Sequence, residues 1–156
     1  MATVLPSSDP SRPAPPSSPL ARGGISLPGW AYWLALLLLC SAYLQGGIDK
    51  ALDFPAAIAE MNHFGLAPAA PFAAAVIALE IGASLLILTG RWRWLGALAL
   101  AAFTLAASFM ANRFWAAAQG ERVMLANAFF EHLGLVGGFI AVAWYDLGTR
   151  ASRRIS

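Results

Sequence analysis

Four apolar runs, each close to 20 residues long, constrain the fold of this chain more than any other feature. They cover residues 30–45, 71–89, 92–112 and 123–146, and residues 46–49 extend the first. About 20 helical residues cross ~30 Å of hydrocarbon, and backbone groups in lipid must pair within their own segment. With 59% hydrophobic and 12% charged residues, the chain is predicted to be all-α, an integral membrane four-helix bundle.

The segments around the runs have a different composition. Residues 1–28 hold seven of the ten prolines and are predicted to be a disordered, Pro-rich cytoplasmic tail. Without an apolar core before Trp30, this tail is not a signal peptide, so the first span is expected to act as an uncleaved anchor. The membrane domain is expected at 29–147, followed by a basic cytoplasmic C-terminal tail at 148–156.

The segment between the first two runs mixes polar and apolar residues. Leu52, Phe54, Ile58 and Met61 approximate one helical face, which predicts a short interfacial helix over 55–63, ended by the glycine and proline that follow. A plain surface loop is the alternative.

Basic residues predict the orientation of the spans. One side of a four-span chain carries seven arginines, at positions 12, 22, 91, 93, 150, 153 and 154. The other side carries three basic residues, Lys50, Arg113 and Arg122. The richer side should be cytoplasmic, with both termini inside. Since the net charge is only +2 and the basic residues flank the runs, no nucleic-acid partner is expected. The expected partner is the lipid bilayer.

One carboxylate lies in the middle of the second run. Placing Glu80 in hydrocarbon costs about 2.5 to 3.5 kcal/mol on insertion scales, so the fold must bury it against protein, pair it or hold it neutral. Because Glu80 lies near the expected midplane, its surroundings are the first candidate for a functional site, with Glu80 as a possible proton-exchanging group.

Helical spacing places polar residues in a stripe on every span, since residues four apart share a helix face. The first stripe holds Ser41, Gln45 and Asp49, and on the second span Glu80 shares a face with Ala73, Val76 and Ser84. The third stripe holds Thr104, Ser108 and Asn112, and the fourth Asn127, Glu131, Gly134 and Gly138. Intramembrane polar groups normally face the bundle interior. We therefore expect a polar pocket that opens outward, with these binding residues: Gln45, Asp49, Lys50, Asn112, Glu131 and His132.

Simpler interpretations exist for several of these residues. Ser and Thr hydroxyls can bond to their own helix, and the pairs Gly134/Gly138 and Ala78/Gly82 have the small-xxx-small spacing of close helix packing. Glu131 and His132 lie ~100° apart, so both cannot point inward. Cys40 is the only cysteine and is expected to be an inert apolar residue. No metal or haem site is expected, because the two histidines are far apart.

An ordered set of short motifs resembles the DoxX family of small four-span bacterial inner-membrane proteins. The motifs are Tyr43-Leu44-Gln45-Gly46-Gly47-Ile48-Asp49-Lys50, Phe64-Gly65-Leu66-Ala67-Pro68, Leu79-Glu80-Ile81-Gly82, Gly90-Arg91-Trp92-Arg93, Phe103-Thr104 and Phe114-Trp115. The resemblance spans about residues 30–145. It implies an inner-membrane four-helix bundle, and it places Lys50 and Glu80 at recurring charged positions.

Three functions follow as hypotheses. The resemblance implies a subunit or accessory of a membrane oxidoreductase system, with a quinone as the expected cofactor and other membrane subunits or a homo-oligomer as partners. The second hypothesis is a non-enzymatic scaffold or assembly factor, in which Glu80 and Lys50 form a structural pair. A small-solute or proton transporter ranks third, because the chain shows no inverted repeat or broken helix pair.

Overall fold

The computed structural model describes residues 28–155, with side chains described to Ser152. This part of the chain folds into five α-helices and one 3-10 turn, without any strand. The elements are α1 (Gly29–Leu52), α2 (Phe54–His63), α3 (Ala69–Thr89), α4 (Arg93–Ala111), η2 (Phe114–Ala116) and α5 (Arg122–Ile155). The all-α prediction is confirmed, whereas the Pro-rich tail predicted for 1–28 lies, apart from Pro28, outside the described residues.

Four of the helices, α1, α3, α4 and α5, are long and apolar enough to cross a membrane, as the runs predict. Two of them are longer than expected. The first run was expected to reach at most Asp49, but α1 continues to Leu52. The last run was expected to end at Asp146, but α5 continues without a break to Ile155, so the segment predicted as a C-terminal tail is helical.

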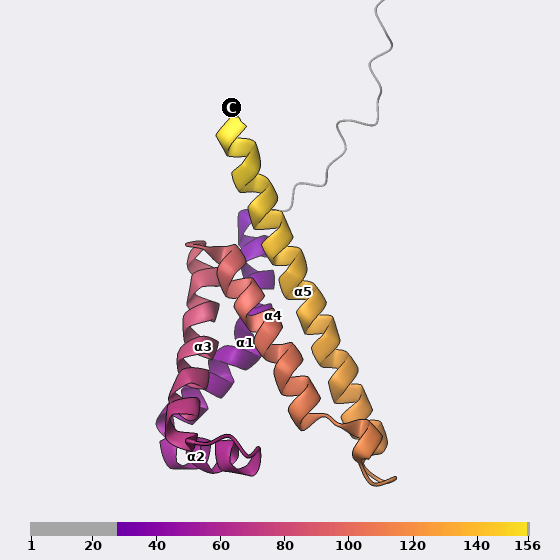
Figure 1. Cartoon of the computed structure of the whole chain (residues 1–156). Helices are drawn as coiled ribbons and strands as arrows, with labels where there is room; N and C mark the ends of the chain where they lie inside the picture. The colour runs from indigo at the N-terminus through magenta and orange to yellow at the C-terminus, as the bar shows by residue number, and fades with distance from the viewer. Residues whose placement is uncertain (1–27, 156) are drawn as a thin grey trace, which may run out of the picture.

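The long helices pack in a row, α1 against α3, α3 against α4 and α4 against α5, while α1 and α5 barely touch. Figure 1 shows that the pair α1 and α3 meets the pair α4 and α5 near the turn between α3 and α4. The two pairs diverge toward the opposite end, where α2 and η2 lie. We call these the turn end and the α2 end of the bundle.

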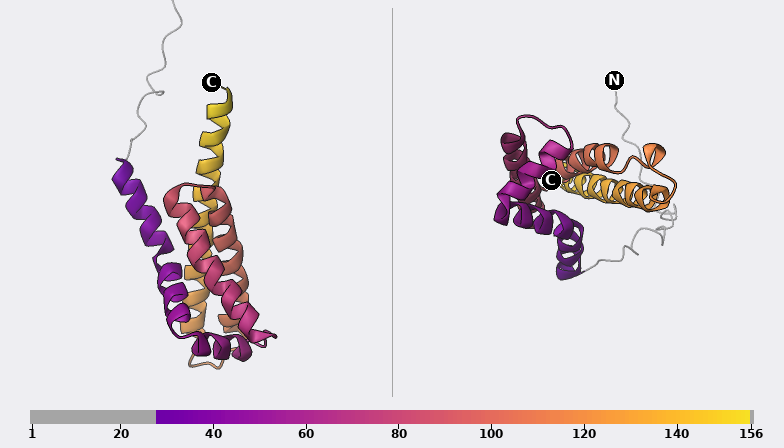
Figure 2. Two further views of the ribbon diagram at one scale, coloured as in Figure 1. Left: turned by 90° about the vertical axis from the view of Figure 1, so that its left-hand side faces the viewer. Right: turned by 90° about the horizontal axis from the view of Figure 1, so that it is seen from below.

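The short helix predicted over 55–63 is confirmed as α2. Asp53 caps its N-terminus, since the carboxylate accepts a hydrogen bond of 3.1 Å from the amide of Ala56. Gly65 ends the helix in the left-handed region at φ 72°. Ala57 and Met61 are buried against Ala73 of α3. Figure 2 shows α2 lying across the end of the bundle, roughly perpendicular to the long helices.

The main core lies toward the turn end, where the helices are closest. Its fully buried side chains include Leu36, Ile87, Leu100 and Phe139, one from each long helix. Gly96 lets α4 approach α3, because a Cβ there would lie 2.6 Å from the backbone oxygen of Ala83.

A buried carboxylate joins α5 to the start of α4 at the turn end. Asp146 is 7% exposed, and it accepts hydrogen bonds from the Trp94 amide at 3.3 Å and from Arg150 Nε at 2.8 Å. Arg150 also donates to the backbone oxygen of Gly90 at 3.3 Å. Because α4 has no side-chain cap of its own, Asp146 supplies one from another helix.

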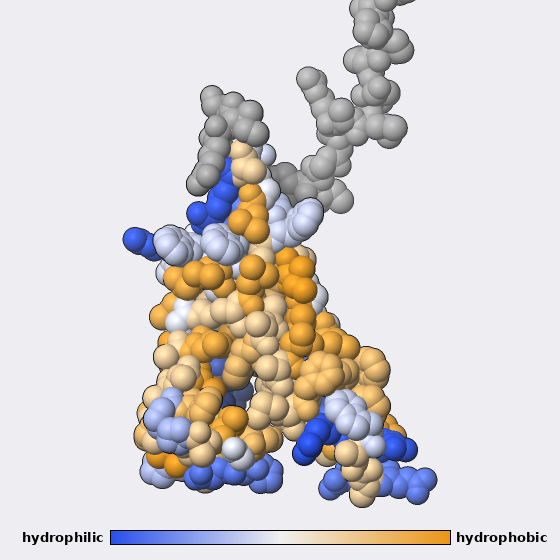
Figure 3. Space-filling model, in the orientation of Figure 1, coloured by the Kyte–Doolittle hydropathy of each residue, from blue (hydrophilic) through white to orange (hydrophobic). Residues whose placement is uncertain are grey.

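The surface agrees with a position in a bilayer. Figure 3 shows an apolar band across the middle of the face in view, with hydrophilic residues gathered toward the turn end and the α2 end. Large apolar side chains of the long helices, such as Leu38, Leu85 and Ile140, are at least half exposed. A contiguous exposed apolar surface of this kind suits contact with lipid.

Candidate functional site

A cavity of about 480 Å³ fills the space between the diverging helix pairs at the α2 end. All five helices contribute to its lining, which is mostly apolar. The polar side chains on it are Tyr43, Lys50, Glu60, Glu80, Thr104 and His132. Ligand pockets are commonly 300–1,000 Å³ and carry a few polar groups on apolar walls. The cavity therefore has the size and composition of a site for a small organic molecule.

An ion pair between α1 and α3 forms the charged wall of the cavity. Lys50 Nζ lies 3.4 Å from each carboxylate oxygen of Glu80. Glu80 is 6% exposed, and the side chain of Lys50 is 19% exposed. The structure thus buries and pairs the carboxylate that the apolar run made costly. At 3.4 Å the contacts are longer than the 2.7–2.9 Å of the strongest charge-assisted hydrogen bonds, and both side chains line the cavity.

Two glycines make room for this pair on α1. A Cβ at Gly47 would lie 2.8 Å from Ile81 Cγ1 and 3.3 Å from Glu80 Cβ. A Cβ at Gly46 would lie 3.4 Å from Lys50 Nζ. The absence of both Cβ atoms lets α1 approach α3 closely. Lys50, one helical turn after the glycines on α1, can therefore reach Glu80 on α3.

Other polar groups face the cavity from the remaining helices. Tyr43 and Thr104 join α1 and α4 through a buried hydrogen bond between their hydroxyl groups. His132 lies on the α5 wall, where its Nδ1 pairs with the backbone oxygen of Ala128 at 2.6 Å. Glu60 reaches the cavity from α2. Sequence reasoning placed Thr104 on an inward-facing stripe without counting it among the pocket residues, and it missed Tyr43 and Glu60. Glu60, beside the buried-face position Met61, carried a usable signal.

Of the six predicted binding residues, Lys50 and His132 line this cavity and the other four do not. Gln45 and Asp49 are exposed and bond to each other, with the Gln45 amide donating to the Asp49 carboxylate at 3.1 Å. Asn112 is half-buried at the end of α4 and lies outside the lining. On α1, the buried face is that of Cys40, Tyr43 and Gly47, so the polar stripe of this helix points away from the interior.

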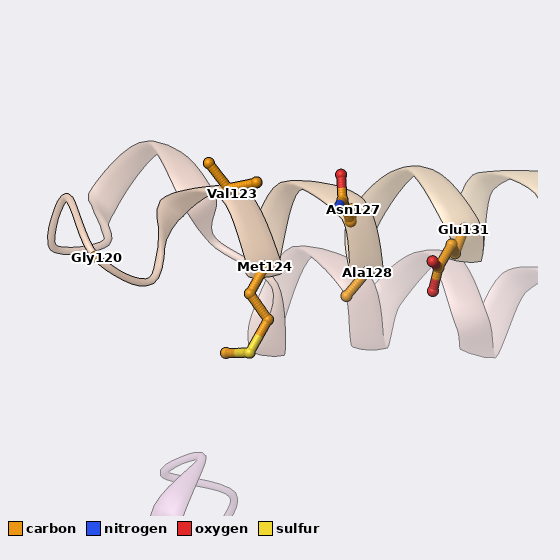
Figure 4. A pocket seen from close by; sticks show the side chains of 6 residues that line it. All are labelled: Gly120, Val123, Met124, Asn127, Ala128 and Glu131. Atoms are coloured by element: carbon orange, nitrogen blue, oxygen red, sulfur yellow. The ribbon is translucent and has the colours of Figure 1, made fainter.

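The predicted fourth stripe also points outward, which corrects the placement of Glu131. Glu131 and Asn127 are exposed, whereas His132, the next residue, faces the cavity. The physical reason is the apolar face of α5, because Phe139 and Ala143 are buried inside the bundle and fix the helix rotation. Figure 4 shows Glu131 and Asn127 on a separate hollow of about 540 Å³, whose lining comes from α5 and the turn before it.

The simpler interpretations, in which hydroxyl groups bond to their own helix and small residues pack closely, hold for some of these residues and not for others. The hydroxyls of Ser41, Thr104 and Ser108 donate to backbone oxygens of their own helices, at 2.6–2.7 Å, so that prediction is confirmed. Among the glycines of the small-xxx-small pairs, a Cβ at Gly82 or Gly134 would meet no neighbouring helix within 4 Å, so close packing is wrong at these two positions within the described chain. A Cβ at Gly138 would lie 3.3 Å from Leu39 Cδ1 of α1, so close packing is confirmed there.

The cavity adjoins a second hollow at the α2 end. This outer hollow of about 510 Å³ shares Phe64, Met110 and Ala111 with the cavity. It adds three exposed titratable side chains, His63, Arg113 and Glu121. The two spaces therefore lie side by side, separated by walls that they share.

The cavity also opens sideways through apolar residues. Phe72 of α3 and Met110 of α4 are 41% and 37% exposed while lining it, and Ala106 of α4 is exposed as well. Figure 3 shows the surface hollowed between the lower parts of α3 and α4. Among the described residues, no group of three His, Cys, Asp or Glu side chains could hold a metal ion. The site therefore suits an organic ligand that arrives from lipid.

Comparison with known proteins gives one match. The model of the DoxX family matches residues 28–113, more than half of the chain. The match covers α1, α2, α3 and α4, and with them Lys50 and Glu80; the resemblance expected for residues 114–145 lies beyond it, and so does His132. No curated protein and no solved structure matches the chain.

Proposed function

Because this chain belongs to the DoxX family of multi-pass membrane proteins, we propose that it is a subunit or accessory of a quinone-linked membrane oxidoreductase system. In this proposal the cavity binds the head group of a quinone, or of a similar lipid-dissolved reductant, against the pair formed by Lys50 and Glu80. The observation that carries it is a buried ion pair on the wall of an otherwise apolar cavity.

The residues present fit a quinone. A quinone ring has two carbonyl oxygens that need hydrogen-bond donors, and Lys50 offers ammonium protons while Glu80 holds them in place at 3.4 Å. His132 lines the same cavity from α5. The volume of about 480 Å³ suits a ring with a short part of its tail. The rest of the tail can leave between Phe72 and Met110, where exposed apolar side chains adjoin lipid.

When bound, a quinone would supply the redox chemistry, with its electrons exchanged with a partner subunit. The residues of this chain would bind and orient the ring, exclude bulk water and hold a proton at a carboxylate oxygen of Glu80. General acid–base groups act within hydrogen-bond distance of the proton that they transfer. Glu60 lines the cavity and is exposed, so it can relay protons between Glu80 and the water at the α2 end.

The proposal includes location and partners. The α2 end would face outward from the bacterial inner membrane, with both termini cytoplasmic, because the arginines at 91, 93 and 150 lie at the turn end. The subunit that carries electrons would contact this chain at one of the two membrane faces or along its lipid-facing side. A cysteine-accessibility assay on single-cysteine variants at positions 91 and 113, made in a C40A background, tests this orientation in intact cells.

The binding test starts from the full-length protein purified in native lipid. Organic extraction followed by mass spectrometry should recover a quinone in a near-stoichiometric amount, and Glu80→Gln should reduce that amount about tenfold. Asp49→Asn is the matched control, since Asp49 is exposed on α1 outside the cavity. Recovery of no quinone from the native protein, together with no binding of added ubiquinone-1 or menadione, would refute the proposal.

A scaffold is the second candidate, and the packing around Gly47 favours it. The ion pair joins α1 to α3 where a Cβ would clash at 2.8 Å, so the pair could serve the fold alone. A structural pair predicts strong coupling between Lys50 and Glu80 in stability and no effect on membrane electron transfer. A working site predicts loss of electron transfer in a Glu80→Gln protein that remains folded.

A further inference from the structure

We infer that the outward face of α5 docks onto the same face of a second copy of this chain. The face consists of Met124, Asn127, Glu131 and Gly134, which we call the α5 stripe. These residues recur at intervals of three and four, so they lie along one side of the helix and form a seam of the kind along which two helices pack. The inference stands independently of the quinone proposal.

Glu131 is the first reason to expect that another helix packs on this face. It lies nine residues from the start of α5, about 13 Å along the helix axis, and its side chain is exposed. Exposed to hydrocarbon, a carboxylate costs about 2.5 to 3.5 kcal/mol. Within the described chain Glu131 makes neither a hydrogen bond nor an ion pair, in contrast to Glu80, so its partner must come from outside.

The space along the α5 stripe is the second reason. The hollow of about 540 Å³ is lined by α5 and Gly120 alone, and no atom lies within 4 Å of a Cβ built on Gly134. One turn further, Leu39 of α1 contacts Gly138, and the two helices then separate. A helix from a neighbour can therefore continue along α5 where α1 leaves it, with Gly134 allowing close approach.

Hydrogen-bonding complementarity indicates that the neighbour is a second copy. Asn127 offers amide donors one helical turn from the Glu131 acceptor. In a parallel pair related by a two-fold axis, the Asn127 amide of each copy can donate to the Glu131 carboxylate of the other, which satisfies both copies at once. Two-fold dimers are the commonest symmetric assembly, and Asn side chains commonly bond across membrane helices.

The test is oxidative cross-linking of single-cysteine variants in native membranes. The full-length chain with Cys40→Ala receives Met124→Cys on the α5 stripe, or Ile140→Cys as the control. Ile140 is 50% exposed, against 64% for Met124, but lies ~120° or more around the helix from every residue of the stripe. A disulfide-linked homodimer should form at position 124 and at least fivefold less at position 140.

A second measurement tests the role of the two polar residues. In lipid vesicles, energy transfer between labelled copies should report dimerisation that Glu131→Leu and Asn127→Leu each weaken about three- to tenfold, in line with one interhelical hydrogen bond. Glu131→Gln, which keeps an acceptor, should retain the dimer. Equal cross-linking at both positions, cross-links to other proteins only, or dimerisation unchanged by Glu131→Leu in a folded protein would overturn the inference.

Discussion

Replacing Lys50 by methionine is expected to destabilise the bundle because it leaves Glu80 buried without a partner. Lys50 Nζ lies 3.4 Å from both carboxylate oxygens. At an effective dielectric constant of 20, two unit charges at that distance attract by about 5 kcal/mol. Much of this attraction offsets the desolvation of the two groups, so the net value of the pair is small even though the loss of one partner is costly.

Removing one partner of a buried pair typically costs about 3 to 5 kcal/mol. Since the Lys50 side chain keeps 19% of its exposure, water can solvate part of the site, and we expect about 3 kcal/mol for Lys50→Met. Replacing both residues, Lys50→Met with Glu80→Met, should return the free energy of unfolding to within about 1 kcal/mol of the native value, because apolar side chains of similar volume fill the same space.

The free energy of unfolding can be measured by titrating the purified protein from mild detergent micelles into dodecyl sulfate while following helicity and tryptophan fluorescence. Asp49→Asn is the control, since Asp49 is exposed one residue before Lys50 and should change stability by less than about 0.5 kcal/mol. The reasoning fails if Lys50→Met costs no more than this control, or if the double variant is less stable than both single variants.

Three further predictions use the same titration. Gly47→Ala should lower the free energy of unfolding by about 1 to 3 kcal/mol, because its Cβ would lie 2.8 Å from Ile81 Cγ1. Gly82→Ala, with open space around it, should be neutral or slightly stabilising. Equal effects of the two substitutions would contradict the close approach of α1 and α3. Asp146→Ala should cost about 2 kcal/mol by removing the cap of α4 and the Arg150 partner. Asp146→Asn, which keeps an acceptor for the Trp94 amide, should cost about half as much. An Asn variant as unstable as the Ala variant would contradict the capping role. Tyr43→Phe should cost about 1 kcal/mol through its lost bond to α4, and no change would show that the hydroxyl bond is dispensable.

Local patterns along the chain were enough to predict most of the fold. The lengths of the apolar runs predicted α1, α3, α4 and α5, because hydrocarbon thickness and backbone pairing leave no other solution for such runs. The apolar face of residues 52–61 predicted α2. The helix ends were less predictable. Gly148 and Thr149 are poor helix formers, yet α5 continues through them to Ile155, and Arg150 bonds back to Asp146 one turn earlier.

The candidate site was predictable only in part. The position of Glu80 in an apolar run identified the carboxylate and its need for a partner, and the spacing of Thr104 and Ser108 identified the buried face of α4. The stripes on α1 and α5 were misplaced, because polarity alone does not set the rotation of a helix. Glycine contacts at Gly47 decide which face of α1 meets α3, and the packing of Phe139 decides which face of α5 turns inward.

The sequence by itself determined that residues 28–155 are helical, that they include four helices suited to cross a membrane, and that Glu80 needs a partner among them, because each of these follows from the cost of placing polar groups in hydrocarbon. Only the tertiary structure decided that Lys50 is that partner, that His132 faces the cavity while Glu131 faces outward, and that the helix pairs diverge around about 480 Å³ of space. These outcomes depend on how far each helix rotates and tilts against its neighbours, which is set by contacts between residues distant in the chain.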